Sequence, residues 1–181
     1  MVNIWKDFFK HLHTVNVHRW EVFKLCLKCG IPFRGLLHDL SKYSFTEFFE
    51  SMKFYSSGKY SPIVDCKKKK GYSNAWLHHK GRNKHHYEYW WDPTAPTPRP
   101  IIPFKYMVEM ICDRIAASKT YNKGSYDNSM PLKYFYKEEP KMVLNDKLKD
   151  MLEEVFKRLS KDGESILNKK ELYRIYIKHI K

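Results

Sequence analysis

The stretch Gly35-Leu36-Leu37-His38-Asp39-Leu40-Ser41-Lys42 decides how the rest of the chain is interpreted. Its two adjacent leucines predict a helix anchored in a core, and the end of that helix would deliver the histidine and the aspartate together. A neutral imidazole nitrogen and a carboxylate oxygen both bind divalent first-row metals. The stretch therefore predicts a metal site, and its lysine lies close enough to meet an anion bound there.

The composition is that of a folded and strongly basic chain. It has 181 residues, of which 43% are hydrophobic, enough for one domain with a substantial core. Aromatic residues make up 16%, which argues against disorder. With 34 Lys and Arg against 20 Asp and Glu, the formal charge is +14, which suits an anionic substrate or nucleic acid, or serves only solubility.

Several classes of protein are disfavoured. No apolar run approaches the roughly 20 residues that cross a bilayer. Lys6, Asp7 and Lys10 interrupt the N-terminal apolar residues, so this segment is not a signal peptide. Four cysteines do not form a disulfide scaffold, and we expect a cytoplasmic protein. Cys26 and Cys29 are spaced like half of a zinc site, but without a second pair we interpret them as packing residues.

Helical periodicity dominates the chain and strand signals are poor, so we predict an all-α fold. Ser44 and Glu47 form a capping box at the start of one helix, which leaves Glu47 as a cap rather than a catalytic acid. The Pro-rich residues 92–103 cannot be helical and are expected to cross the mouth of the site. The expected helices are 3–29 with a break near 14–16, 33–38, 45–55, 104–122, 147–159 and 168–181, and residues 56–71 are expected to form a loop.

A second group of candidate ligands lies between residues 78 and 86, where four of nine residues are histidine. On a continuous helix, His79 and His86 would share one face. A break at Gly81 or Asn83 would instead let His85 and His86 turn back toward the metal. The alternative is a basic, aromatic surface patch, although the neighbouring tryptophans favour a segment tied to the core.

The opening stretch resembles the signature of the HD superfamily of metal-dependent phosphohydrolases, which has an apolar pair, His-Asp, two residues and often Lys. The resemblance implies an HD-like helical bundle with one more metal-binding histidine upstream and an aspartate downstream. His18, followed four residues later by Val22, matches the upstream ligand. His11 and His13 are interpreted as surface or satisfied core histidines.

Asp113 matches the downstream ligand, because it falls within the apolar pattern of a helix and a buried carboxylate needs a partner. A salt bridge to Arg114 or Lys42 is the alternative. The complete order resembles that of the HD-GYP branch, whose members bind two or three metals and cleave cyclic dinucleotides, but no Gly-Tyr-Pro follows the paired histidines. Residues 15–122 also resemble an uncharacterised family of phage and bacterial proteins with an HD-like core.

The resemblance implies a phosphohydrolase that acts on a nucleotide or a nucleotide-derived signal. One ion would be held by His18, His38, Asp39 and Asp113, and a second by Asp39, His79, His85 and His86. Fe, Mn, Co, Ni or Zn would suit these ligands, and Lys42 would stabilise charge on the phosphate.

Two other functional classes remain open. One is an HD-fold di-iron oxygenase, and the other is a non-catalytic protein that binds nucleic acid or another partner through basic residues such as Lys67–Lys70. We expect residues 1–124 to form the metal-binding core and 125–181 a helical extension packed on it.

Overall fold

The computed structural model describes residues 4–55 and 60–181, and within these ranges the regular elements are helices. This confirms the all-α prediction. The helices are α1 (Ile4–Lys28), α2 (Pro32–Leu37), α3 (Phe45–Lys53), α4 (Pro62–Lys70), α5 (Asn74–Lys80), α6 (Phe104–Tyr121), α7 (Met130–Glu138), α8 (Asp146–Asp162) and α9 (Lys169–Ile180), with 3-10 turns at Leu40–Tyr43, Tyr87–Tyr89, Glu139–Lys141 and Gly163–Ile166. None of the helices in the described ranges is long and apolar enough to cross a membrane.

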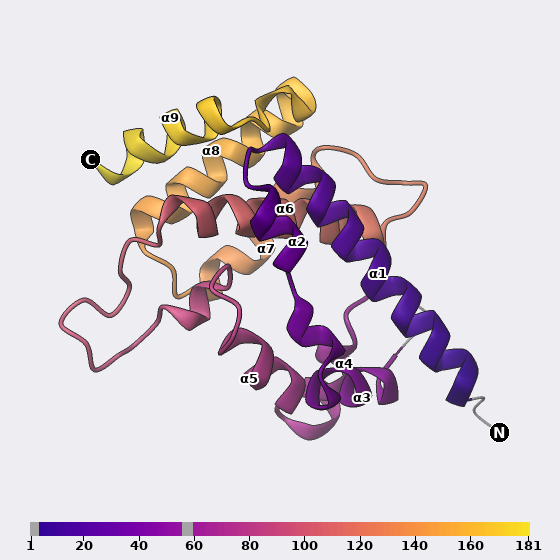
Figure 1. Ribbon diagram of the computed structural model, residues 1–181. Helices are drawn as coiled ribbons and strands as arrows, with labels where there is room; N and C mark the ends of the chain where they lie inside the picture. Colours follow the sequence, from indigo (N-terminus) through magenta and orange to yellow (C-terminus); the bar gives the residue numbers. More distant parts are fainter. Residues whose placement is uncertain (1–3, 56–59) are drawn as a thin grey trace.

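One apolar core joins the two ends of the chain. It runs from Val22 on α1 through the buried face of α6 to α8 and to Tyr176 on α9. Figure 1 shows α8 and α9 stacked on the far side of α6 from the smaller layer that contains α3, α4 and α5. The helices that carry the candidate ligands and the C-terminal helices therefore share an interior, and the boundary near residue 124 stays a prediction.

Several predicted helices are confirmed. The helix α6 covers nearly the whole predicted span, and α8 and α9 begin after Asn145 and Asn168, whose side chains accept from backbone amides of the first turn. The predicted break near residues 14–16 is wrong, because α1 continues through it. Thr14 lies within the helix, and its hydroxyl donates to the Lys10 carbonyl.

The predicted loop at 56–71 is also wrong where the structure describes it. Residues 56–59 lie outside the described residues, but Pro62–Lys70 forms α4. Both signals were present in the sequence: Pro62 begins the helix, and Gly71 ends it in a left-handed conformation with φ +80°. The helix α7, which begins Met130-Pro131, was not predicted.

The two leucines of the opening stretch do not anchor α2 in the core. Leu36 and Leu37 are 58% and 55% exposed, which corrects that prediction. The contact is made by Gly35 instead, where a Cβ atom would lie 2.6 Å from the Cβ of Cys26 on α1. Arg19 completes the attachment by donating to the backbone carbonyls of Leu36 and His38. Close backbone approach and an arginine therefore hold α2, rather than apolar burial.

Candidate metal centre

Asp39 lies at a sharp bend between α2 and the 3-10 turn Leu40–Tyr43. Its φ is +52°, in the left-handed region that aspartate tolerates better than most residues. The side chain is buried, and its two carboxylate oxygens face different sets of partners. Asp39 is therefore placed to join two groups of side chains.

The first group lies on the Oδ2 side of Asp39 and draws on α1 and α6. The Nε2 atoms of His38 and His18 lie 3.3 and 4.0 Å from Oδ2. Asp113 closes the group, since its Oδ1 lies 3.0 Å from His18 Nε2 and 3.6 Å from His38 Nε2. The Lys42 ammonium also contacts Oδ2, at 2.8 Å. Lys42 follows Asp39 by three residues, so a single helical turn brings its ammonium to this carboxylate.

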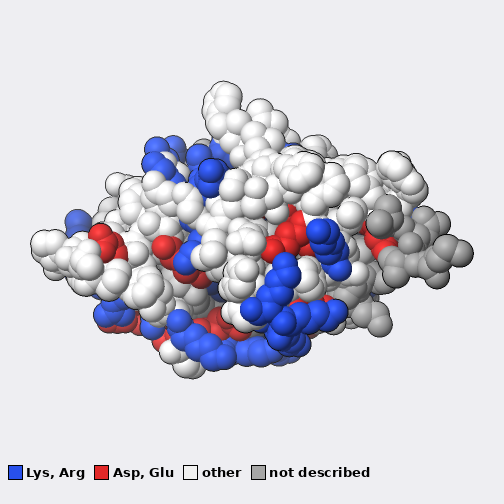
Figure 2. Space-filling model, turned by 90° about the horizontal axis from the view of Figure 1, so that it is seen from below, with Lys and Arg blue, Asp and Glu red and all other residues white. Residues whose placement is uncertain are grey.

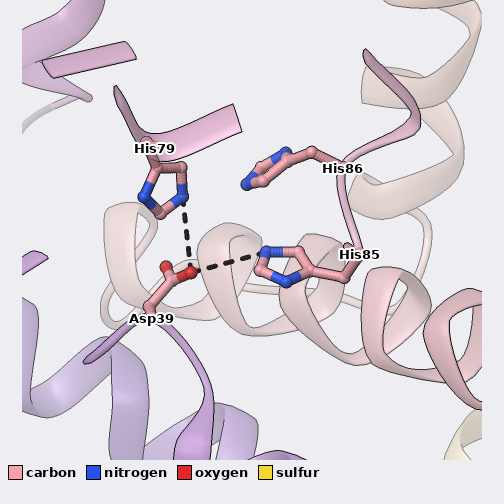
Figure 3. A group of neighbouring side chains, drawn as sticks. All are labelled: Asp39, His79, His85 and His86. Atoms are coloured by element: carbon pink, nitrogen blue, oxygen red, sulfur yellow. Dashed lines mark ion pairs between the residues drawn. The ribbon is translucent and has the colours of Figure 1, made fainter. Parts of the chain in front are cut away.

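The second group lies on the Oδ1 side and draws on α5 and the segment after it. The Nε2 atoms of His79 and His85 lie 3.3 and 3.5 Å from Oδ1 (Figure 3). The His86 ring faces the same space, with its centroid 4.2 Å from that of His85 and 4.7 Å from that of His79. This group forms because α5 ends at Lys80, and Asn83 then bonds the His79 carbonyl and Ser41, which turns the chain back.

All of the predicted ligands are brought together by these contacts. In each group, ligand atoms of every member lie within 4.8 Å of one another. Metal–ligand bonds are about 2.0–2.2 Å, so two ligands on opposite sides of an ion are about 4.0–4.4 Å apart. Each group therefore has the size and chemistry to hold a metal ion. The two groups are His18, His38, Asp39 and Asp113, and Asp39, His79, His85 and His86.

Several of the inward-facing atoms lack hydrogen-bond partners among the described residues. They are the Nε2 atoms of His18, His38, His85 and His86 and the Oδ1 atom of Asp39. Buried polar atoms are nearly always paired, so a concentration of unpaired polar atoms at one point calls for an explanation. A cation coordinated by their lone pairs would satisfy them, and imidazole with carboxylate suits first-row transition metals. The residues therefore fit the predicted metal.

Two carboxylates outside the ligand groups, those of Glu109 and Glu47, contact the Nδ1 atoms of the histidines and orient their rings. The sequence analysis missed both roles. Glu109 Oε1 lies 3.1 Å from His38 Nδ1 and 3.3 Å from His85 Nδ1, while its other oxygen pairs with Arg34 at 2.6 Å. A carboxylate on Nδ1 holds the ring so that Nε2 faces inward. Glu109 lies one helical turn before Asp113, a spacing that could have indicated it. His38, His85 and Glu109 also form a third possible metal group, but Arg34 already neutralises this carboxylate.

Glu47 does the same for the α5 histidines. Its carboxylate oxygens lie 2.6 Å from His78 Nδ1 and 2.7 Å from His79 Nδ1. The capping box is only half confirmed: Ser44 Oγ accepts from the Glu47 amide, but the Glu47 carboxylate is turned toward the histidines. The interpretation of Glu47 as a cap alone was therefore wrong. The contact could not be foreseen, because α5 is distant in sequence and its histidines were not expected to face α3.

The charges within the centre follow from burial and close contacts. Burial alone would raise the pKa of Asp39, but His38, His79 and Lys42 hold it well below its usual range. The pKa of Asp113 is also held well below its usual range, by His18 and His38 against the effect of burial. Both carboxylates are therefore anionic at neutral pH.

Lys42 and His86 differ in charge. Burial lowers the pKa of Lys42, but Asp39 and Asp113 outweigh it and raise the pKa, so the lysine stays cationic. Burial, together with His85 and His79, lowers the pKa of His86 well below its usual value. His86 is therefore neutral, which is the form in which imidazole binds a metal.

A pocket reaches the centre from the side of α1, α3 and α4. Its inner end is lined by His18, Lys42 and Glu47, and its outer part includes His11 and Tyr55. Its cavity volume is about 50 Å³.

The proline-rich residues 92–103 contribute nothing to the described lining of this pocket, so the prediction that they cover the mouth is wrong. They are attached to the C-terminal helices instead, where Arg99 pairs with Asp146 and the Ile102 carbonyl accepts from Tyr176. Figure 1 shows this segment as the long loop that projects on the side away from the N-terminal half of α1.

Comparison with known proteins assigns the chain to a family. No curated protein and no solved structure matches the chain. Residues 7–158 match a family described as a family of unknown function (DUF5662). Because this match covers most of the chain, including every candidate ligand, the protein belongs to the family DUF5662.

Proposed function

We propose that the protein is a metal-dependent phosphohydrolase with an HD-like core, which cleaves a phosphoester of a nucleotide or a nucleotide-derived signal. The observation that carries the proposal is the position of Asp39 between two groups of ligands, with one carboxylate oxygen toward each. A bridging carboxylate flanked by histidines suits a pair of ions that act on one phosphoryl group.

Each residue has a stated task in this proposal. His18, His38 and Asp113 would hold the first ion, His79, His85 and His86 would hold the second, and Asp39 would serve both. When bound, such ions supply an activated water nucleophile and polarise the phosphoryl oxygen. Glu109 and Glu47 keep the histidine rings oriented by accepting from their Nδ1 atoms.

Lys42 binds the substrate phosphate in this proposal. Its ammonium is held 2.8 Å from Asp39 Oδ2, its side chain is 28% exposed, and it lines the pocket. A phosphate that reaches the ligands from the pocket would therefore meet a fixed positive charge. The benefit is greatest in the transition state, where charge on the phosphoryl oxygens is redistributed.

The test combines elemental analysis of the purified protein with a panel of nucleotide phosphoesters. We expect transition metal to co-purify and phosphate or a nucleotide product to be released. In Lys42→Met, turnover should fall roughly 10²- to 10³-fold, as for the loss of one oxyanion donor, while metal content is retained. Lys24→Met is the matched control, because Lys24 is an exposed lysine of α1 paired with Glu21.

Two results would overturn the proposal. One is the absence of metal at His38 and Asp39 after reconstitution, seen by anomalous diffraction. The other is release of no phosphate from any phosphoester by the metal-loaded protein. Consumption of O₂ with a mixed-valent iron signal would favour the oxygenase alternative instead.

The lysine run gives weaker support to nucleic-acid binding. Figure 2 shows Lys and Arg side chains gathered on the face seen from below, the side of α3 to α5. However, Lys67 lies over the Trp76 ring at 4.6 Å, and Lys70 pairs with Glu50 at 3.3 Å. Part of the run is thus used within the protein. RNA or DNA binding that weakens steeply with salt and survives His38→Ala would make this the better assignment.

A further inference from the structure

His11 is a buried histidine that the fold does not satisfy. It is 5% exposed, its ring lies between Phe48 and Tyr55, and its Nδ1 atom has no hydrogen-bond partner within the described part of the chain. The sequence analysis interpreted it as a surface or satisfied core residue, but it is buried, and its Nδ1 atom is unsatisfied among the described residues. Because its side chain lines the pocket, a ligand in the pocket could supply the missing partner.

The position of His11 relates it to the metal centre. His11 and His18 are seven residues apart on the continuous helix α1, and both line the same pocket. At 1.5 Å per residue this separation is about 10 Å along the helix. The pocket therefore extends from the metal ligands to a point about two helical turns away.

The described residues at the far end of the pocket include polar side chains but no charged one. Thr14 and Tyr55 are hydrogen-bonded there through their hydroxyls at 2.9 Å, and Ser51 and Ser61 add further hydroxyl groups. Burial, assisted by Lys42, lowers the pKa of His11 to about 4, so the ring is neutral at pH 7. Neutral imidazole and hydroxyls bind groups that donate and accept hydrogen bonds, whereas they compensate an additional phosphate poorly.

The only Lys or Arg side chain among the described lining residues is Lys42, at the metal end. A substrate with one phosphate can place it against Lys42 and the metal ligands. A diphosphate or triphosphate would extend negative charge along a wall of neutral groups. Among the described lining residues, the pocket thus presents one positive charge at the metal end and neutral side chains at the other.

We propose that His11 is a specificity residue that hydrogen-bonds an uncharged group of the substrate, and that the substrate is a monophosphate of a nucleoside or a sugar. This inference rests on the proposed phosphohydrolase function and narrows it. His11 would bind a ribose hydroxyl, a base edge or a sugar hydroxyl about two helical turns from the reacting phosphate. It would contribute to binding and take no part in the chemical step.

The test compares His11→Leu and His11→Gln with the parent and with His13→Leu. His13 is exposed on the same helix, so its variant controls for loss of a histidine from α1. The substrates are nucleoside 5′-monophosphates, sugar monophosphates, the corresponding di- and triphosphates, and phenyl phosphate, which lacks an uncharged polar group. Circular dichroism verifies folding, and His11→Gln keeps a hydrogen-bonding side chain should leucine disturb the packing.

We expect His11→Leu to raise KM about tenfold for the monophosphate that the parent prefers, which is the effect of losing one well-formed hydrogen bond in a buried site. Its kcat, and all parameters for phenyl phosphate, should stay near those of the parent. His11→Gln should restore part of the loss, and His13→Leu should match the parent. Comparing nucleoside with sugar monophosphates identifies which of the two provides the group.

A binding measurement makes the inference independent of turnover. Isothermal calorimetry of the metal-loaded protein with a nucleoside monophosphate, a sugar monophosphate and orthophosphate should show that His11→Leu weakens only the first or the second. If no phosphoester is cleaved but this pattern holds, the proposed function fails while the binding role of His11 stands. Equal effects on phenyl phosphate and the monophosphates, a parent preference for triphosphates, or binding unchanged by His11→Leu would each overturn the inference.

Discussion

Replacing Glu109 with glutamine removes one charge from a fully buried side chain while nearly preserving its shape. In the native protein this carboxylate accepts from His38 Nδ1, lies against His85 Nδ1 and pairs with Arg34. Glutamine can still accept one hydrogen bond from a histidine ring. It cannot neutralise the charge of Arg34, and it cannot stabilise the Nδ1–H form of both His38 and His85 at once.

The size of the effect follows from the pKa of Glu109. Burial would raise it, but hydrogen bonds from His38 and His85 outweigh burial and lower it from 4.5 to about 2. At 1.36 kcal/mol per pKa unit, this corresponds to about 3 kcal/mol in favour of the charged form. Because the folded pKa lies below the unfolded value, this stability is present above about pH 4.5 and is lost as the pH falls toward 2.

Two assays measure the consequence. Urea unfolding of the metal-free protein at pH 7 should show that Glu109→Gln is about 3 kcal/mol less stable than the parent, and the difference should shrink as the pH falls below 4.5. Competition with a chelator should show metal affinity reduced roughly 10- to 100-fold, as for loss of other outer partners of metal-bound histidines. Glu21→Gln is the control, because Glu21 forms only a surface pair with Lys24 and should change stability by less than about 1 kcal/mol.

The reasoning would be refuted by a variant that unfolds at nearly the parent urea concentration and binds metal within about threefold of the parent. That result would mean that the histidine rings are held by packing alone. A large loss of stability with unchanged metal affinity would keep Glu109 as a structural partner of Arg34, but would remove its role in orienting the ligands.

Three further predictions concern α1 and α2. Gly35→Ala should destabilise the protein by about 1–3 kcal/mol in thermal or urea unfolding, because the added methyl group meets Cys26 at 2.6 Å; an unchanged melting temperature would show that α2 moves aside freely. Leu36→Ala should change stability by less than about 0.5 kcal/mol, because Leu36 is largely exposed, and a core-sized loss would contradict the structure. His11 binds a proton more readily when unfolded, since its pKa falls from 6.5 to about 4 on folding. The parent should therefore lose up to about 3 kcal/mol more stability than His11→Leu between pH 6.5 and 4, and parallel pH profiles would count against a buried, neutral His11.

Most candidate ligands could be found from the sequence because their signals are local, whereas His18 was assigned through the resemblance to the HD superfamily. His38 and Asp39 are adjacent, and the histidines of 78–86 are concentrated far above their usual frequency. The long helix α6 has enough turns for its apolar periodicity to be recognised, and Asp113 interrupts that pattern. Asparagines at the starts of α8 and α9 give cap signals that depend only on the adjacent backbone.

The helix α2 shows why the buried face of a short helix could not be predicted from its sequence. It has six residues, too few for periodicity to reveal which face is covered. Its two leucines are apolar, but the face that meets α1 is the one with Gly35, and only the packed arrangement identifies it. An apolar pair beside a motif therefore indicated a helix but not its orientation.

Tertiary structure alone decided how the ligands are supported and reached. Glu47 and Glu109 are ordinary helix residues in sequence, and they become partners of histidines only because α3 packs on α5 and α6 passes beside the bend at Asp39. The surroundings of His11 also depend on tertiary structure. Its ring is enclosed by Phe48 on α3 and by Tyr55, which follows α3. Local spacing determined which residue types can bind a metal, whereas contacts between residues distant in sequence determined their orientation, their charge and the pocket that leads to them.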